Sequence, residues 1–374
     1  MPKPPRRHPI HGLPFDSPIR NRLRFEYERL PLRDRAAALR KVAQREAYLL
    51  LLGQTGRRVA RAPQATSRML WVYNWTTIGD SLMDLAVRRA VPAHVRIDLY
   101  IAEWLAPMFA GDPRFEHIYT RIEDCAGPYD FVVMQEFNSR CVRMKIKAAP
   151  RAPFATVFGH LRGEQFDRMS FAQRRFEQLF GLPVGDPAPQ WLALGPRPER
   201  DAARTRIAVG LGAKDPRRWY RRWPEVLQAL LAQWPADRAP PEFVLLGNRT
   251  GHEDLARFPP ELVATHCRVE IDRLALPEVV RCMHECDAFL GADGGLMHLA
   301  VACDLPGLAL FAEIDPAMRL LSGTRLRSLS ADGAIGSLGP LRVADEWLQA
   351  VFPDETQNAL RTTASICASA TPWL

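Results

Sequence analysis

The sequence predicts an α/β protein made of two doubly wound domains, each with a parallel sheet, that face each other across a cleft. Two observations carry this prediction. Apolar runs rich in strand-forming residues alternate with amphipathic, helix-like runs along most of the 374 residues, as parallel sheets with crossover helices require. The alternation breaks at a proline-rich stretch, residues 183–198, and restarts beyond it. We therefore expect two similar domains joined by a linker.

These breaks divide the chain into four segments. Residues 1–68 form a basic, proline- and arginine-rich extension that is partly helical, and residues 353–374 form a tail. The two predicted domains are residues 69–190 and residues 199–352. Hydrophobic residues make up 47% of the chain, which is ample for two cores.

The net charge of +8 is concentrated in the extension. Residues 1–68 hold 16 Lys and Arg against 5 Asp and Glu, whereas the remaining 306 residues hold 34 against 37. Such a segment suits an anionic lipid surface, a nucleic acid or an acidic partner. Prolines predict extended chain over residues 1–18, and apolar residues at helical spacing predict a helix over 19–52, interrupted at Pro31. The helix could equally pack on its own domain or on a second subunit.

Signals for export and membrane insertion are missing from the sequence. No run of eighteen apolar residues occurs, and the N-terminus lacks the apolar core of a secretory signal. The seven cysteines include no C-x-x-C pair, so reduced and mostly buried thiols are expected. We therefore expect a cytoplasmic protein.

The first domain is expected to begin with a strand at Met69, because the run MLWVY is apolar and rich in β-formers. A turn over residues 74–78 and a helix over 79–90 follow it. The later elements predicted for this half are a strand at 95–101, a helix at 103–109 and a strand at 129–134.

The second domain repeats the pattern. Its predicted strands are residues 206–211, 242–246, 287–290 and 307–311. Its predicted helices are residues 224–233, 253–258, 277–285 and 296–302. Ligands of doubly wound sheets bind at the carboxyl ends of the strands, so we expect the functional residues in the turns that follow these strands.

The first such turn is Thr77-Ile78-Gly79-Asp80. Gly79 permits a tight turn, and Asp80 lies at the start of the predicted helix. An aspartate in this position commonly caps orphan N–H groups. Alternatively, it is a general base, which needs a carboxylate aimed at an acceptor hydroxyl.

The second is the run from Gly291 to His298, with the sequence GADGGLMH, between a predicted strand and helix. Adjacent glycines let a phosphate approach the backbone, and the helix N-terminus supplies N–H donors and a positive dipole. His298 falls one turn into the helix, where it faces the same ligand or is a half-buried structural histidine.

The third is a basic run after the first strand of the second half. It consists of Lys214, Arg217, Arg218, Arg221 and Arg222, followed by Trp223-Pro224. Guanidinium groups match phosphate oxygens, whereas a solvated basic loop is the alternative.

The sequence disfavours a metal site. No D-x-D pair of carboxylates occurs anywhere in the chain. Cys282, His284 and Cys286 resemble a ligand cluster, yet the two cysteines lie one turn apart on a predicted helix and the histidine points elsewhere. We expect neither a metal nor a cofactor.

Together these motifs resemble glycosyltransferase family 9, the heptosyltransferases. The family's I-G-D turn is matched by Ile78-Gly79-Asp80, and its K-R-W-P-like run by Arg221-Arg222-Trp223-Pro224. Its D-T-G-x-x-H motif, with the alanine, proline, apolar strand and Asp-Pro that follow, is matched by Asp293–His298, Ala302, Pro306, 308–311 and Asp315-Pro316. The match covers roughly residues 69–350.

The resemblance implies a GT-B fold of two Rossmann-like domains, the first for the acceptor and the second for the nucleotide sugar. It implies inverting transfer of a heptose from ADP-heptose to a lipopolysaccharide-core or related glycan. Asp80 would be the base, with Thr77 and Gly79 in the acceptor-side turn. Glu253, by a loose match, would bind the ribose of the donor. The residues implied in donor binding are Lys214, Arg221, Arg222, Glu253, Asp293, Gly294, Gly295, Leu296, Met297 and His298.

Three positions depart from the family pattern. Gly294 replaces a threonine, Arg221 a lysine, and Ala312-Glu313 a Gly-Pro pair. They leave open a UDP- or GDP-hexose donor, or a family member that binds a nucleotide sugar without turnover. The expected partners are the sugar donor, the glycan or glycolipid acceptor and, for the basic extension, an anionic inner-membrane surface; no nucleic acid is expected.

Overall fold

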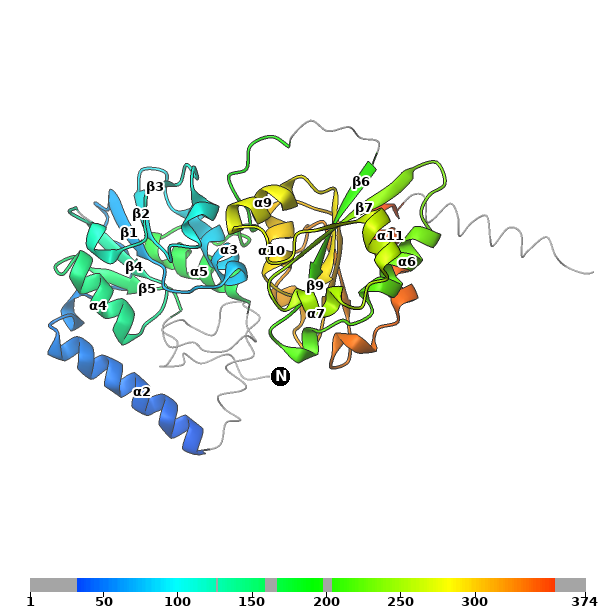
Figure 1. Ribbon diagram of the computed structural model, residues 1–374. Helices are drawn as coiled ribbons and strands as arrows, with labels where there is room; N and C mark the ends of the chain where they lie inside the picture. Colours follow the sequence, from blue (N-terminus) through cyan, green and yellow to red (C-terminus); the bar gives the residue numbers. More distant parts are fainter. Residues whose placement is uncertain (1–31, 126, 159–166, 198–203, 354–374) are drawn as a thin grey trace, which may run out of the picture. The chain divides into compact units, whose positions relative to one another are not determined.

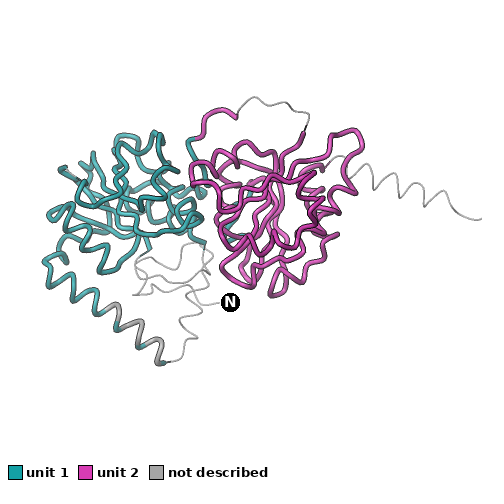
Figure 2. Tube along the Cα trace, in the orientation of Figure 1, with its two compact units in different colours: residues 1–193, 317–322 teal, residues 194–316, 323–374 magenta. Residues whose placement is uncertain are grey.

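The computed structural model describes residues 32–125, 127–158, 167–197 and 204–353. The chain divides into two compact units (Figure 2). Unit 1 consists of residues 1–193 and 317–322, and unit 2 of residues 194–316 and 323–374. The domain boundaries given by the sequence are not decided by this division and stay predictions.

Unit 1 is built on a five-stranded parallel sheet with the order β3-β2-β1-β4-β5. Its strands are β1 (Arg68–Val72), β2 (Arg96–Tyr100), β3 (Phe115–Tyr119), β4 (Phe131–Met134) and β5 (Phe154–Thr156). Every residue of β4 is fully buried, which explains its unbroken apolar sequence, since both faces of the sheet are covered. The strand order reverses between β1 and β4, so these two strands flank the switch point where ligands of such sheets bind.

Helices and short 3₁₀ turns connect the strands of unit 1. They are α3 (Ile78–Leu85), η2 (Ala86–Ala90), η3 (Ala106–Phe109), η4 (Ile122–Asp124), α4 (Ser139–Ala148) and α5 (Arg168–Phe180). Asn138 and Asp167 cap α4 and α5 by accepting backbone N–H groups of Cys141 and Ser170. Gly181, with φ of 65°, ends α5 in the left-handed conformation that favours glycine.

The second half of the basic extension belongs to unit 1. The described part of the predicted helix is α2 (Leu32–Leu51), shown in Figure 1. Residues 1–31, including the first part of the predicted helix, lie outside the described residues. Leu49 is fully buried in the core of unit 1, and Gln54 accepts a hydrogen bond from the buried Lys145 ammonium at 2.7 Å.

Unit 2 has a six-stranded parallel sheet with the order β11-β10-β9-β6-β7-β8. Its strands are β6 (Arg204–Leu211), β7 (Ala239–Gly247), β8 (Cys267–Val269), β9 (Ala288–Ala292), β10 (Gly307–Phe311) and β11 (Leu326–Ser330). Here the order reverses between β6 and β9. The two sheets confirm the predicted α/β class with two doubly wound halves.

Helices cover both faces of the second sheet, with α6 and α11 on one face and α9 and α10 on the other (Figure 1). The helices are α6 (Trp223–Ala232), α7 (Gly251–Leu255), α8 (Pro260–His266), α9 (Leu276–His284), α10 (Gly295–Ala302) and α11 (Pro340–Val351), with short turns η5 (Pro216–Arg218) and η7 (Ile335–Ser337). The turn η6 (Pro316–Met318) begins the segment 317–322 that belongs to unit 1. Across the described ranges, no helix combines the length and apolar character needed to cross a bilayer.

Two predicted helices of the first half differ from the structure. The predicted helix at 79–90 is α-helical only to Leu85 and continues as the 3₁₀ segment η2. The predicted helix at 103–109 is reduced to η3, where Pro107 follows directly after the first residue and cannot donate a backbone hydrogen bond.

Candidate functional site

The predicted site residues follow the strands that flank the switch point of their unit, except Glu253, which follows β7. In unit 1, Val72 and Met134 are paired at the ends of β1 and β4. In unit 2, Gly210 and Gly291 are paired near the ends of β6 and β9. Each unit therefore brings two loops together at the carboxyl edge of its sheet, and each pair of loops carries charged side chains.

Asp80 lies in the first turn of α3, immediately beyond β1. Its carboxylate accepts a hydrogen bond from the Thr77 hydroxyl at 2.6 Å and lies 3.5 Å from Arg168 Nε. Its side chain is 22% exposed, so one part of the carboxylate is open to solvent. Thr77, not Asp80, holds the N-cap position of α3. The predicted capping role is therefore not the arrangement seen, because the partners of Asp80 among the described residues are side chains.

Beneath Asp80 lies a buried polar group that sequence reasoning missed. Arg168 of α5 donates to both carboxylate oxygens of Asp84, at 2.9 and 2.5 Å, and the Tyr73 hydroxyl donates to Asp84 at 3.2 Å. Asp84 is completely buried, and Arg168 is 4% exposed. The guanidinium lies 4.6 Å from the ring of Trp75 and 4.8 Å from that of Phe158.

The charges in this group shift each other's ionisation. Burial raises the pKa of Asp84 to about 6, although the Arg168 guanidinium opposes the shift. Burial would lower the pKa of Arg168, but the carboxylates of Asp84 and Asp80 outweigh it and hold the pKa above its ordinary value. Burial, followed by the charge of Asp84, raises the pKa of Tyr73 well above its usual range. Above pH 6 Asp84 is therefore mainly ionised beside the Arg168 guanidinium.

A second polar group follows β1 and β4, whose ends lie side by side. Asn74 and Asn138 both donate to the same oxygen of Glu136, Asn74 at 3.0 Å. Glu136 comes two residues after the end of β4, as Asn74 comes two residues after the end of β1. Sequence reasoning missed Glu136, although polar residues directly after the apolar run FVVM are a signal that could have found it.

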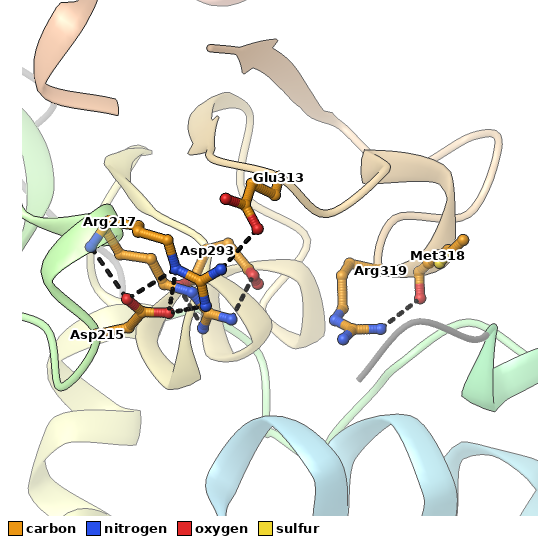
Figure 3. Close-up of polar contacts among 7 residues, drawn as sticks. Asp215, Arg217, Asp293, Glu313, Met318 and Arg319 are labelled. Carbon is orange, nitrogen blue, oxygen red and sulfur yellow. Dashed lines mark hydrogen bonds and ion pairs between the residues drawn. The ribbon is translucent and has the colours of Figure 1, made fainter. Parts of the chain in front are cut away.

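In unit 2, the loop after β6 carries a chain of ion pairs. The Arg217 guanidinium lies between the carboxylates of Asp215 and Glu313, each 2.6 Å away (Figure 3). Hydrogen bonds from the side chain and backbone of Arg217 lower the pKa of Asp215 to about 2. Glu313 belongs to the Ala-Glu pair that departs from the family pattern, so this departure provides a partner for Arg217.

Asp293 follows β9, and Arg218 is its partner. The Arg218 guanidinium donates to the Asp293 carbonyl at 3.3 Å and lies 3.4 Å from its carboxylate. Gly294 and Gly295 open helix α10, so their backbone N–H groups lie at its N-terminus. The side chain of Met297 is fully buried in the core, and His298 is 3% exposed. Met297 therefore contributes to packing in this structure.

Arg221 and Glu253 lie together at a small pocket. It is lined by Gly212, Ala213, Trp219, Arg221, Thr250, Glu253 and Asp254. Arg221 lies 3.1 Å from Glu253 and 3.6 Å from Asp254, with its guanidinium 4.6 Å from the Trp219 ring. Asp254 also accepts the backbone N–H of Gly212 at 2.8 Å, and burial raises its pKa.

The structure does not bring every predicted donor residue to this pocket. Arg222 pairs instead with Glu225, three residues along its own helix, at 3.6 Å. Lys214 is exposed on the loop after β6, and no carboxylate in the described part of the chain pairs with it. Leu296 is partly buried beside Gly210, where its side chain packs near the sheet.

The cysteine and histidine residues of α9 have other partners. His284 Nε2 lies 3.0 Å from the carbonyl oxygen of Gly195, Cys286 donates to the carbonyl of Cys282, and Arg268 donates to the Cys282 sulfur. Within residues 32–353, leaving aside the gaps in the description, no three His, Cys, Asp or Glu side chains are grouped as metal ligands.

Comparison with known proteins bears on the family and the fold. Residues 199–330 match the sequence profile of glycosyltransferase family 9 (heptosyltransferase). No curated protein sequence matches the chain. Among solved structures, a glycosyl transferase family 9 protein from Veillonella parvula has 14% identity and a TM-score of 0.61, covering 78% of this chain and 98% of that one.

Two E. coli structures are also similar. ADP-heptose LPS heptosyltransferase II has 18% identity and a TM-score of 0.61, covering 77% of this chain and 99% of its own. Heptosyltransferase WaaC with ADP has 17% identity and a TM-score of 0.55, with the same coverage. These likenesses confirm the α/β fold of the GT-B kind. The resemblance to glycosyltransferase family 9 (heptosyltransferase) that the sequence motifs predicted is thus confirmed by the match of residues 199–330 to the model of that family.

Proposed function

We propose that this protein is an inverting glycosyltransferase that moves a heptose from a nucleotide sugar, ADP-heptose, to a hydroxyl of a lipopolysaccharide-core or related glycan. One observation carries the proposal. In each unit, two neighbouring strands are followed by turns that carry charged side chains. A carboxylate suits the acceptor hydroxyl, and positive charge suits the diphosphate of the sugar donor. Unit 1 offers a partly exposed carboxylate, Asp80, and unit 2 offers arginines and a helix N-terminus.

The reaction assigns one task to each unit. The oxygen of the acceptor hydroxyl attacks the anomeric carbon of the sugar donor, and Asp80 takes the proton of that hydroxyl. The bond between that carbon and the diphosphate oxygen breaks on the opposite side, so the configuration inverts. The diphosphate leaves with the bonding electrons, and its negative charge is stabilised by backbone N–H groups after Asp293 and by Arg218 and Arg221.

In this mechanism the arginines do the electrostatic work that a divalent cation does in other transferases. Transfer should therefore survive EDTA unchanged. The measurement is the rate of product formation with and without chelator, followed by added magnesium or manganese. A rate that EDTA removes and a metal restores would contradict the metal-free mechanism.

The nucleotide and the sugar are tested by thermal shift. The melting temperature should rise with ADP and ADP-heptose more than with UDP- or GDP-sugars at equal concentration, because ligand binding to the folded state stabilises it. A larger shift with UDP- or GDP-hexose would indicate a different donor. Binding of ADP-heptose without transfer to any glycan would favour the non-catalytic alternative, which Gly294 in place of threonine motivates.

The basic extension is proposed to contact the anionic inner-membrane surface on which a glycolipid acceptor lies. Each Lys or Arg near such a surface contributes about 1 kcal/mol, which salt screens. Full-length protein should sediment with phosphatidylglycerol-containing vesicles at low salt and be released at high salt. Since Leu49 and Gln54 pack into unit 1, the informative truncation removes residues 1–31 and leaves that packing intact. If the truncated protein sediments as the full-length protein does, the membrane contact is made by residues after position 31.

A further inference from the structure

The buried group under Asp80 has an arrangement that a simple structural ion pair does not need. Asp80 and Asp84 are four residues apart on α3, so both carboxylates project from one face of the helix. One guanidinium, Arg168, lies against both. It is not shared equally: Asp84 receives two hydrogen bonds at 2.9 and 2.5 Å, whereas Asp80 lies 3.5 Å away.

The guanidinium is also confined. It lies against the rings of Trp75 and Phe158, and Trp75 belongs to the same loop as Asp80. Arg168 is held at the first turn of α5, where Asp167 caps the helix. The hydroxyl of Tyr73, the residue directly after β1, donates to Asp84 and thereby fixes the second carboxylate. Three elements of unit 1 thus fix the charge that lies next to the proposed base.

We propose that Asp84 and Arg168 are positioning residues for Asp80: Arg168 orients the base, and Asp84 engages Arg168 so that the base keeps its proton affinity. This inference rests on the proposed function, in which Asp80 takes the acceptor proton. At a partly exposed carboxylate, binding by both arms of an arginine would weaken the base, because the cation stabilises the ionised form; at the fully buried Asp84, burial outweighs this effect. Asp84 takes that bidentate position, and Asp80 receives orientation from the remaining contact and from Thr77.

The proposal predicts opposite effects from the two partners. In Asp84→Asn, Arg168 loses its carboxylate and turns its charge to Asp80, so the pKa of Asp80 falls. In Arg168→Gln, Asp80 loses its cation and faces Asp84 alone, so its pKa rises. Among the described residues, the charged and titratable groups that interact with Asp80 include Arg168 from α5, Asp84 from α3 and Tyr73, which directly follows β1. We expect shifts of about one pH unit in each direction.

The test is titration of the Asp80 carboxyl by carbon NMR in ¹³C-aspartate-labelled full-length protein, with the resonance assigned by its loss in Asp80→Asn. This readout needs no turnover, so it decides the linkage even if no sugar donor supports transfer. Activity is measured separately. The acid limb of kcat should move to lower pH in Asp84→Asn and to higher pH in Arg168→Gln, with KM for the sugar donor unchanged.

Arg88 and Asp112 provide the matched control. They form a second buried ion pair of unit 1, with NH2 and Oδ2 2.7 Å apart, and their partners are Trp191 and the rings of Phe109 and Phe115. Asp112→Asn should lower the stability of the protein as Asp84→Asn does, but it should leave the NMR titration curve of Asp80 unchanged.

Each outcome of the titration either supports or overturns the proposal. Shifts of opposite sign support the proposal, whereas shifts of one sign, or none, overturn it and make the group a structural pair. If Arg168→Gln does not fold, the isosteric Asp84→Asn decides alone: a fall in the pKa of Asp80 supports the proposal, and a rise or no change overturns it. An active Asp80→Asn enzyme would instead remove the proposed base, whatever the titration shows.

Discussion

The two units support their key carboxylates in opposite ways. Asp80 of unit 1 rests on a buried network in which Asp84 is inaccessible and Arg168 nearly so. Asp293 of unit 2 is met by Arg218, whose side chain is 22% exposed and lies on a loop that also carries the half-exposed Arg217. Both carboxylates follow a strand at a switch point, so topology alone does not explain the difference.

The difference fits the two tasks that we propose. A general base acts on a neutral hydroxyl and depends on geometry, which a buried network fixes in advance. A site for a diphosphate must admit and release a strongly charged ligand, which arginines on an accessible loop can do by exchanging a carboxylate partner for phosphate oxygens. In this proposal the site of unit 1 is organised before the substrate binds, whereas the arginines of unit 2 pair with carboxylates that phosphate oxygens can replace.

The largest expected effect comes from Asp80→Asn. The amide keeps the shape and the Thr77 contact but accepts no proton, so transfer should fall by roughly 10²–10⁴-fold. Affinity for ADP should stay within two-fold, because the sugar donor is bound by unit 2. Initial rates and calorimetric titration with ADP measure the two quantities.

The exposed acid Asp124 of unit 1 gives the control for this experiment, since Asp124→Asn should retain full activity. Should Asp80→Asn keep more than about a tenth of the wild-type rate, the base lies elsewhere and the buried network under Asp80 has a structural purpose.

The next effect is in unit 2. Arg218→Gln should weaken ADP binding about 10- to 100-fold, because hydrogen bonds to charged groups contribute roughly 1.5–3 kcal/mol each. Arg217→Gln is the matched control: two carboxylates, Asp215 and Glu313, each lie 2.6 Å from this guanidinium, whereas Arg218 lies 3.4 Å from the single carboxylate of Asp293, so the loss of Arg217 should change affinity less than about three-fold. Calorimetry at low and high salt tests both variants. Equal losses at 217 and 218 would mean that the loop rearranges as a whole on binding.

A smaller expected effect is the pH dependence of stability, which should differ between Asp84 of unit 1 and Asp215 of unit 2. The folded-state pKa of Asp84 is raised to about 6 from an ordinary value of 3.8, so the folded protein holds a proton between these values that the unfolded chain has released. Its contribution to stability is therefore greatest below pH 4 and decreases as the pH rises to 6. Relative to Asp84→Asn, the free energy of unfolding of the wild type should fall by about 1–3 kcal/mol over this window.

Asp215 in unit 2 should behave differently. Its pKa is lowered to about 2, so it stays ionised from pH 4 to 6, and Asp215→Asn should show no such trend. Urea unfolding at pH 4, 5, 6 and 7 measures both variants. A stability difference between wild type and Asp84→Asn that does not change with pH would show that Asp84 is ionised throughout.

The sequence predicted the helices of the second unit better than those of the first, but it missed two strands in each unit. Every predicted strand is present, and β10 has the predicted limits, because apolar runs flanked by Gly, Pro and Asp mark strand ends clearly. The strands that were not predicted are β3 (FEHIY) and β5 (FAT) of unit 1 and β8 (CRV) and β11 (LRSLS) of unit 2. β3 and β11 carry polar residues on edge strands, and β5 and β8 have only three residues, so none of them shows a clear period.

For the candidate site, the sequence likewise predicted residues that stand in local motifs and missed residues that tertiary contacts bring together. Asp80, Asp293 and Arg221 stand in short motifs next to strands, so their places could be anticipated. Arg168 is 88 positions beyond Asp80, on a helix that was not predicted, and its pairing with Asp84 depends on how α5 packs against α3. No local pattern reports such a contact, because it is formed by tertiary structure. The contact of Arg217 with Glu313, 96 positions further along the chain, was hidden for the same reason, whereas the Arg217–Asp215 and Arg222–Glu225 pairs are local.

The smallest expected effect is a gain, from Gly294→Thr. The backbone at Gly294 is extended, with φ of 171° and ψ of −172°, and a Cβ there would meet no atom closer than 3.9 Å. Threonine should therefore fit without strain and supply the hydroxyl that the family pattern has at this position. One added hydrogen bond to the diphosphate is worth about 0.5–1.5 kcal/mol, so ADP should bind roughly two- to ten-fold more tightly. Gly294→Val has nearly the same shape without the hydroxyl, and it should leave affinity unchanged or lower. If threonine and valine behave alike, the hydroxyl does not reach the phosphate, and the exposed arginines of unit 2 already provide the binding that the threonine gives elsewhere in the family.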